Sequence, residues 1–282
     1  MNHTPTKDSA PMHPAGLHIT TARPTGGGLA PTIAAEWTKL WSVRSTWWSL
    51  AGTAALMAVF GGSLGYQPDQ PAGAPPAEQL LPVEYAALVA LLLAQFALLA
   101  LAVLVITGEY ATGSIRSTLL WDPRRGRVLL AKAVVLALVV LVAGTAVAAL
   151  AVIAADLLAG EYGVFVLSHV AEVCARIGGY LAVAALLALG VGTAIRSTAG
   201  ALTTIFVLFL LAPYVLLQAT SDLVVTISQY LPGIAGMEYI GTAELLGIVD
   251  LPYGPNGGLA ILAAWAAAAL VAGYAVLRLR DA

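Results

Sequence analysis

The chain has 282 residues and a net charge of −2; 60% of the residues are hydrophobic and only 10% are charged. Ordinary soluble proteins carry about 25% charged residues, so a soluble fold of this size could not cover its surface. The composition therefore excludes a soluble enzyme and a disordered regulator, and the absence of a basic surplus excludes a nucleic-acid binder. A mean hydropathy of +0.88 predicts an all-α membrane protein with several spans.

The first 30 residues differ in composition from everything that follows. They are polar and rich in Pro, Thr and Gly, and they contain no apolar core of the kind that a signal peptide needs. Such a composition cannot bury a hydrophobic core. We therefore expect a disordered cytoplasmic tail over residues 1–30 and a membrane domain over residues 31–282.

An amphipathic pattern runs from Ile33 to Trp48, where apolar side chains recur at helical spacing while Glu36 and Lys39 fall on the opposite side. The pattern predicts a helix that lies flat on the inner leaflet, with its tryptophans at headgroup level and a basic polar side. A plain aromatic belt without a mechanical role would explain the tryptophans equally well. The candidate residues of this interfacial helix are Trp37, Lys39, Trp41 and Arg44.

Six stretches are apolar and long enough to cross a bilayer. They cover residues of about 47–66, 84–107, 128–153, 175–195, 200–219 and 258–277. The connecting loops 67–83, 154–174 and 220–257 contain no Lys or Arg. The alternate connections carry basic residues, namely Arg116, Arg124, Arg125 and Arg127 in one and Arg196 in the other, and the segment before the first span carries Lys39 and Arg44. Basic residues stay on the cytoplasmic side of membrane proteins, so the distribution predicts that both termini are cytoplasmic.

The connection between the second and third spans has a distinctive sequence. Gly108 and Gly113 permit sharp turns, Ser114 is a good helix cap, and Pro123 prevents continuation of a helix. These residues predict a two-turn helix over 114–121. So short a helix is not stable by itself, so we expect it to pack on the membrane surface or on a partner.

The charges and apolar residues of this connection add three expectations. Ile115 and Leu119 share one face of the short helix and would make its contact. Glu109 lies at the membrane boundary, where Arg116 or Arg124 is its expected partner; a simple headgroup-level charge is the alternative for Glu109 and for Arg116.

Two features are expected on the other side of the membrane. Arg176 follows Glu172 by one helical turn, so it either pairs with that acid or contacts a substrate, because ionisable groups at membrane depth are often functional. The long loop 220–257 contains a mostly apolar stretch that is too short to span. We expect it to form one or two short helices that dip into the outer leaflet or cap the bundle.

Motifs for catalysis and metal binding are not expected to operate in this chain. The G-x-S-x-G string at 61–65 ends a membrane helix and lacks the strand and turn that a hydrolase needs. The sequence has no P-loop, so it should not bind ATP. Its single cysteine, Cys174, permits no Cys/His metal spacing.

The segments 36–47 and 108–116, together with Pro123 and the two arginines after it, resemble the permease subunits of ABC-2 type ABC transporters. The resemblance covers about residues 33–280 and is greatest to small standalone permeases of Gram-positive bacteria, especially actinobacteria. It implies six transmembrane helices, an N-terminal interfacial helix, a short cytoplasmic coupling helix, and short re-entrant or outer helices before the last span.

The resemblance also implies partners and residue roles. Residues 33–46 would be a connecting helix, and 108–121 would include a coupling helix seated on a separate ATP-binding subunit. That subunit would carry ATP and Mg²⁺, and this chain would hold no catalytic, cofactor or metal site. Two ATP-binding subunits and two permeases, identical or related, would form an exporter of an amphipathic or hydrophobic compound in the bacterial plasma membrane.

Two sets of site residues follow from the resemblance. The partner-binding set is Gly108, Glu109, Tyr110, Thr112, Gly113, Ile115, Arg116 and Leu119. The substrate path would run between two permeases along polar side chains of spans two and five, namely Gln95, Thr203, Thr204 and Gln218.

Two other functions stay open at this point. One is a membrane protein without transport activity, such as an assembly factor, an immunity factor or a signalling partner. The other is a secondary carrier, which the scarcity of carboxylates inside the spans disfavours, since ion-coupled carriers usually keep such groups for proton or sodium relay.

Overall fold

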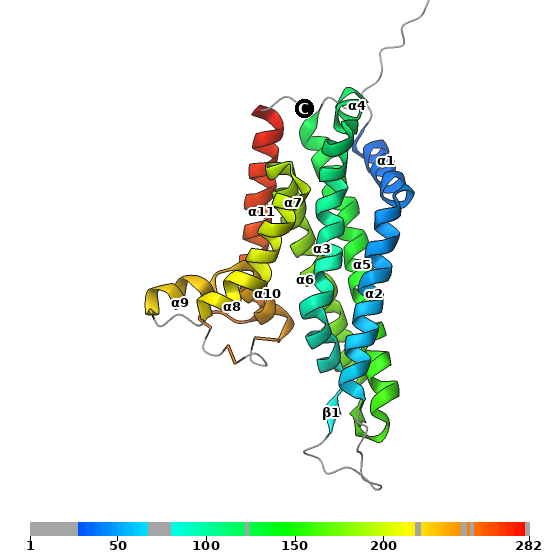
Figure 1. The fold of residues 1–282 in the computed structure, drawn as a ribbon, viewed down its shortest axis with the longest axis vertical. Helices are drawn as coiled ribbons and strands as arrows, with labels where there is room; N and C mark the ends of the chain where they lie inside the picture. The colour runs from blue at the N-terminus through cyan, green and yellow to red at the C-terminus, as the bar shows by residue number, and fades with distance from the viewer. Residues whose placement is uncertain are drawn as a thin grey trace, which may run out of the picture.

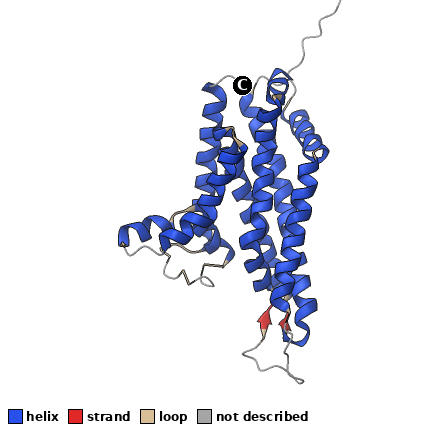
Figure 2. Cartoon of the chain, in the orientation of Figure 1, coloured by secondary structure: helices blue, strands red, loops and turns tan. Residues whose placement is uncertain are grey.

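The computed structural model describes residues 28–66, 80–121, 124–217, 221–243, 247–248 and 251–279. In these ranges the chain is almost entirely helical, and Figure 2 shows that its only strands form one small pair at the end of a helical bundle. Six of the helical segments are long and apolar enough to cross a membrane. The prediction of an all-α, multi-pass membrane protein is confirmed at this level.

Each predicted span has a counterpart in the structure. The candidate spans cover Arg44–Gly65, Glu84–Thr112, Arg125–Tyr162, Leu167–Ile195, Thr198–Val215 and Pro255–Leu279. Most extend beyond the predicted ranges because polar helix ends continue past the apolar stretch that sequence hydropathy detects. The fifth ends at Val215 as a candidate span, helix continues to Leu217, and the last predicted residues, 218–219, lie outside the described residues.

The first four helices form two pairs, and in each pair a single residue separates one helix from the next. Helix α1 (Leu29–Ser42) is separated from α2 (Arg44–Gly65) by the extended residue Val43. Helix α3 (Glu84–Thr112) ends at Gly113, whose φ of 71° turns the chain into α4 (Ser114–Trp121). Helix α1 therefore begins four residues and ends six residues earlier than the predicted interfacial helix, Ile33 to Trp48, whereas α4 has the predicted bounds.

The C-terminal half contains the longest helices and the irregular fifth span. Its long helices are α5 (Arg125–Ala159), α6 (Leu167–Ile195) and α11 (Pro255–Leu279). The fifth span joins α7 (Thr198–Phe206), a π-helical turn over Val207–Leu211, and α8 (Ala212–Leu217). Two short helices follow, α9 (Asp222–Gln229) and α10 (Pro232–Ile240).

Helix α6 is the centre of the bundle, packed against α3, α5 and α11, and it is the most buried of the six spans. Helix α2 lies along α3 and α5 (Figure 1). Helix α1, α4 and the end of α11 lie at one end of the bundle in Figure 1, as six crossings require. At the other end β1 (Leu81–Pro82) pairs in parallel with β2 (Gly163–Val164), which follows the 3₁₀ turn Gly160–Tyr162.

Small residues allow the long helices to approach closely, as is common between membrane helices. A Cβ atom on Gly65 of α2 would lie 2.2 Å from the backbone oxygen of Ala155 in α5. One on Gly190 of α6 would lie 2.5 Å from the backbone carbonyl carbon of Ala269 in α11. Glycine therefore sets the helix separation at both interfaces.

We expect Gly190→Ala to lower the thermal unfolding midpoint of the purified protein, because α6 and α11 must separate to admit the methyl group. Overpacking of this kind costs about 1–3 kcal/mol. Gly52→Ala is the matched control, since no atom lies within 4 Å of its added Cβ. It should leave stability unchanged or raise it by about 0.5–1 kcal/mol through better helix propensity. Equal destabilisation by both substitutions would contradict this packing.

Candidate functional site

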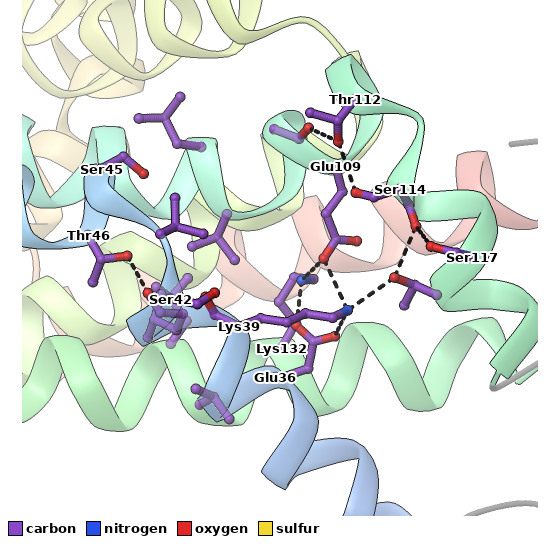
Figure 3. Close-up of a pocket in the computed structure, with 18 residues that line it drawn as sticks. Glu36, Lys39, Ser42, Ser45, Thr46, Glu109, Thr112, Ser114, Ser117 and Lys132 are labelled. Carbon is purple, nitrogen blue, oxygen red and sulfur yellow. Dashed lines mark hydrogen bonds and ion pairs between the residues drawn. The ribbon is translucent and has the colours of Figure 1, made fainter.

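Four charged side chains meet where α1, α3 and α5 come together, and we call Glu36, Lys39, Glu109 and Lys132 the charge cluster. Lys132 Nζ donates to Glu36 Oε2 at 2.6 Å and to Glu109 Oε1 at 2.9 Å. Lys39 Nζ donates to Glu36 Oε1 at 2.8 Å and to the same Glu109 oxygen at 3.3 Å (Figure 3). Two acids and two bases therefore form a closed, electrically neutral ring.

The charge cluster is buried at its centre. The side chain of Lys132 is 3% exposed and that of Glu36 is 4% exposed. Transfer of an ion from water into a protein interior costs several kcal/mol unless partners and hydrogen bonds compensate. Lys132 has two carboxylates as partners, so the presence of α1 beside α5 is what makes its burial tolerable.

The neighbours of the two α1 residues keep both of them charged. Burial raises the pKa of Glu36, but the nearby charges and hydrogen bonds of Lys132 and Lys39 outweigh it, so the pKa lies below its ordinary value of 4.5. Burial lowers the pKa of Lys39, but Glu36 and Glu109 outweigh it and the pKa lies above its ordinary value of 10.5. Both side chains are ionised at neutral pH.

The orientation of α1 differs from the sequence-based expectation. Glu36 and Leu40 are buried, whereas Trp37 is 43% exposed. The charged side of α1 therefore faces the bundle, where Lys132 and Glu109 satisfy it. Trp41 packs between Trp37 and Trp47, with ring centroids 5.7 and 5.3 Å away. Arg44, the fourth candidate of this group, is exposed at the start of α2.

Helix α4 has the predicted length, but its apolar face packs on its own chain. Ile115 is 3% exposed and belongs to the hydrophobic core, and Leu119 packs against the same core. Ile115 therefore makes its contact with its own chain, whereas Leu119 is only partly buried and its contact with a partner stays a prediction. The outward side of α4 carries Arg116, Ser117 and Leu120, the last of which is 84% exposed.

The turn residues before α4 are only partly as predicted. Gly113 makes the turn, but Gly108 lies within α3 and makes none. Ser114 is the first residue of α4, and its hydroxyl is hydrogen-bonded to that of Thr112 at 3.0 Å, so it is not the expected cap of α4. Tyr110 turns toward α6, where the Arg196 guanidinium lies 5.1 Å from its ring centroid.

The partners of Glu109 also differ from the prediction. Its carboxylate binds Lys39 and Lys132, and neither Arg116 nor Arg124 appears among its ion pairs in the described residues. Sequence reasoning missed Lys132 as a site residue, because 96 positions separate it from Glu36. The only available signal was that a Lys and a Glu lie near the ends of neighbouring apolar segments, and that signal selects no particular pair.

A cavity of about 440 Å³ adjoins the charge cluster (Figure 3). Lys39 Nζ donates to Thr118 Oγ1 of α4 at 3.1 Å and so connects the cluster to the short helix beside the cavity. The lining of the cavity combines the charge cluster with hydroxyl groups and aliphatic side chains. The hydroxyl residues are Ser42, Ser45, Thr46, Thr112, Ser114, Ser117 and Thr118; the aliphatic ones are Leu40, Val43, Leu104, Val105, Val135 and Leu136.

The residues predicted to form a substrate path between two permeases lie in different surroundings within this chain, and the path itself stays a prediction. Gln95 is 2% exposed and accepts a hydrogen bond from Tyr180 Oη of α6, so it is a satisfied core residue. Thr203 is exposed on α7, and Thr204 Oγ1 donates to the Gly200 carbonyl at 2.8 Å. Gln218 lies outside the described residues. The bundle thus encloses Gln95, whereas Thr203 faces outward.

At the opposite end of the bundle, Arg176 makes the local ion pair that was one of its two predicted alternatives. Its Nη2 atom lies 2.5 Å from Glu172 Oε1, and its Nη1 donates to the Tyr239 carbonyl at 3.3 Å.

Within the described ranges, no three His, Cys, Asp or Glu side chains gather as a protein metal site would require. No protein-family model and no curated protein matches the chain.

We expect the charge cluster to make stability fall in acid. Because the pKa of folded Glu36 lies below its ordinary value of 4.5, its contribution is fully present above pH 4.5 and is lost as the pH falls through the folded pKa. Lys39 has a raised pKa, so its contribution is present below pH 10.5 and is lost only as the pH rises through the folded pKa. The contribution of these two residues to stability should be constant between these limits.

The measurement is the thermal unfolding midpoint of the detergent-solubilised protein as a function of pH. Glu36→Gln should lower the midpoint at neutral pH and make its fall in acid less steep. Glu172→Gln is the control, because that carboxylate is 57% exposed and exposed pairs contribute little. If the unfolding midpoint of Glu36→Gln fell in acid as steeply as that of the wild type, Glu36 would not be the cause of the acid sensitivity.

Proposed function

We propose that this chain is the membrane-spanning permease subunit of an ABC-2 type transporter, driven by a separate ATP-binding subunit. The observation that carries the proposal is the charge cluster, which connects two short helices at one end of the bundle to two of its long spans. A protein that converts movement of a surface helix into movement of transmembrane helices needs such a connection. The resemblance of segments 36–47 and 108–116 to permeases supports the same conclusion.

In this proposal the outward side of α4 is the contact for the ATP-binding subunit. Ile115 faces the core, so the contact belongs to the opposite side, which includes Arg116, Ser117 and the exposed Leu120. A single exposed leucine next to a charged residue is a suitable anchor for a pocket on a partner. Residues 108–121 thus keep their proposed role as the coupling segment, with a different docking face.

The movement would pass from α4 to the spans through the charge cluster. Closure of two ATP-binding subunits around ATP and Mg²⁺ would displace α4. Thr118 would pull on Lys39, and Lys39 is bonded to Glu109 of α3 and, through Glu36, to Lys132 of α5. Helices α1, α3 and α5 would therefore move as one body, as in other rigid-body transitions.

The remaining features of the proposal follow the resemblance and the charge distribution. Both termini would be cytoplasmic, because the loops without Lys and Arg all alternate with basic ones. Two permeases, identical or related, would form the path, and the cargo would be an amphipathic or hydrophobic compound exported across the bacterial plasma membrane. Helices α9 and α10 would lie at the outer leaflet, and α1 would lie at the inner one.

The test is co-purification of this chain with ATP-binding subunits encoded in the same genome, followed by measurement of ATP hydrolysis in proteoliposomes. Leu120→Glu should reduce co-purification at least about fivefold, the effect of losing an interface anchor worth about 1 kcal/mol or more. Leu157→Glu is the matched control, because Leu157 is 76% exposed at the far end of α5. It should leave co-purification unchanged.

Two results would contradict the proposal. If no ATP-binding subunit is retained by the wild-type chain, the function is one of the two alternatives: a membrane protein without transport activity, such as an assembly, immunity or signalling protein, or a secondary carrier. If Leu120→Glu retains the subunit as well as the wild type does, α4 is only a connector between spans.

A further inference from the structure

The tight turn between the fourth and fifth spans contains a residue with a strained backbone. Arg196 directly follows α6, and its φ of 60° and ψ of 12° place it in the left-handed region. In the described part of the chain, it is the only residue other than glycine with a positive φ. This conformation costs free energy for a residue with a Cβ atom, and it persists only where surrounding contacts impose it. The contacts of the Arg196 side chain therefore need to be considered.

The guanidinium group of Arg196 contacts two other spans. Its central carbon lies 5.1 Å from the ring centroid of Tyr110, which belongs to the last turn of α3, and this is a cation–π distance. Its Nη2 atom donates to the carbonyl of Val276 at 3.3 Å, near the end of α11. Carbonyl groups there have no donor within their own helix, and the helix dipole favours a positive charge beside them. One side chain thus joins the ends of α3, α6 and α11.

The same turn is attached to α3 at a second point. Thr198, the first residue of α7, donates from its hydroxyl to Thr107 Oγ1 of α3 at 2.9 Å. Thr107 is 1% exposed, and its own hydroxyl donates to the Val103 carbonyl at 3.0 Å. Polar groups buried at this depth are therefore paired across two spans. The turn between α6 and α7 is held against α3 from both of its ends.

These contacts reach the helices that the hydrogen bonds and ion pairs of the charge cluster do not join. The charge cluster connects α1 and α4 to α3 and α5, whereas Arg196 connects α3 to α6 and α11. Glu109 and Tyr110 are consecutive residues, so the two sets of contacts meet in the last turn of α3. We propose that Arg196 is a positioning residue that makes the cytoplasmic ends of α6 and α11 follow α3. The origin of that movement rests on the proposed function, but the link itself does not.

Helix α11 also has a contact with α5 that competes with this explanation. Arg125 donates to the carbonyls of Leu277 and Arg278, the latter at 3.4 Å. If Arg125 alone fixed the end of α11, removal of Arg196 would leave that end in place relative to α3. If Arg196 is the link, its removal frees the end of α11 from α3 although Arg125 is intact. A distance between α3 and α11 therefore separates the two explanations.

The experiment measures that distance in the purified full chain by double electron–electron resonance. Spin labels are attached through Ala111→Cys in the last turn of α3 and Leu279→Cys at the end of α11, both at exposed positions. The background carries Cys174→Ala, which removes the single native thiol. The wild-type residue at 196 should give one narrow distance distribution. Arg196→Ala should give a broader distribution that extends to longer distances.

Matched variants test each side of the contact. Tyr110→Phe keeps the aromatic ring and should keep the narrow distribution, whereas Tyr110→Ala should broaden it as Arg196→Ala does. Arg176→Ala removes the arginine at the opposite end of α6, where it pairs with Glu172, and should leave the distribution unchanged. Circular dichroism and thermal unfolding establish that each variant is folded. The Tyr110 pair decides the question if the Arg196 variants do not fold.

Arg196→Gly distinguishes positioning from simple helix termination. Glycine adopts the left-handed conformation without strain and is the residue most often found there at the end of a helix. If Arg196 only ended α6, this variant would unfold at a higher temperature than the wild type and keep the narrow distribution. We expect the narrow distribution to be lost, because the side chain that joins the helices is absent.

Three results would overturn the proposal. They are a broad distribution in the wild type, a narrow one in folded Arg196→Ala or Arg196→Gly, and equal distributions in Tyr110→Phe and Tyr110→Ala. The measurement needs no ATP-binding subunit, so its failure is distinct from failure of the proposed function. A chain that retains no such subunit but loses its narrow distribution in Arg196→Ala would contradict the transport proposal and support this link.

Discussion

The arrangement of one whole end of this protein depends on the burial of a single ammonium group. Lys132 projects from the start of a long membrane span and is 3% exposed. Its charge is tolerable there only because Glu36 and Glu109 arrive from two other helices. If α1 moved away from α5, Glu36 and Lys132 would both lose a charged partner. The free energy of that loss holds the N-terminal helix on the bundle more firmly than its few buried apolar side chains could.

The same pairing explains why two short helices can keep their shape. Neither α1 nor the two-turn α4 is long enough to be stable in isolation. Helix α1 is held by Glu36 and Lys39, and α4 is held by Ile115 in the core and by the Lys39–Thr118 hydrogen bond. Four helices are thereby joined into one unit with a cavity inside it. The proposed transport function uses this unit as a mechanical link.

Sequence reasoning predicted the features that hydrophobicity and local backbone chemistry control. Apolar stretches defined six spans, and Gly113 followed by a short amphipathic run defined α4 to the residue. It did not predict which face of α1 meets the protein, because a charged face is buried only when distant residues satisfy it. It did not predict the hydrogen-bond partner of Gln95 either, since Tyr180 lies 85 positions away. Long-range pairing of polar groups leaves no periodic trace in one sequence.

The most direct test of the role of the charge cluster is a charge exchange between Glu36 and Lys132, measured as the thermal unfolding midpoint of the purified protein. Glu36→Lys and Lys132→Glu should each lower the midpoint strongly, because each places like charges about 3 Å apart in a buried position. The double variant restores opposite charges between positions 36 and 132 and returns the cluster to zero net charge, but it places like charges beside Lys39 and beside Glu109. It should therefore be more stable than either single variant and less stable than the wild type. A double variant no more stable than the worse single one would contradict the dependence of this fold on that ion pair.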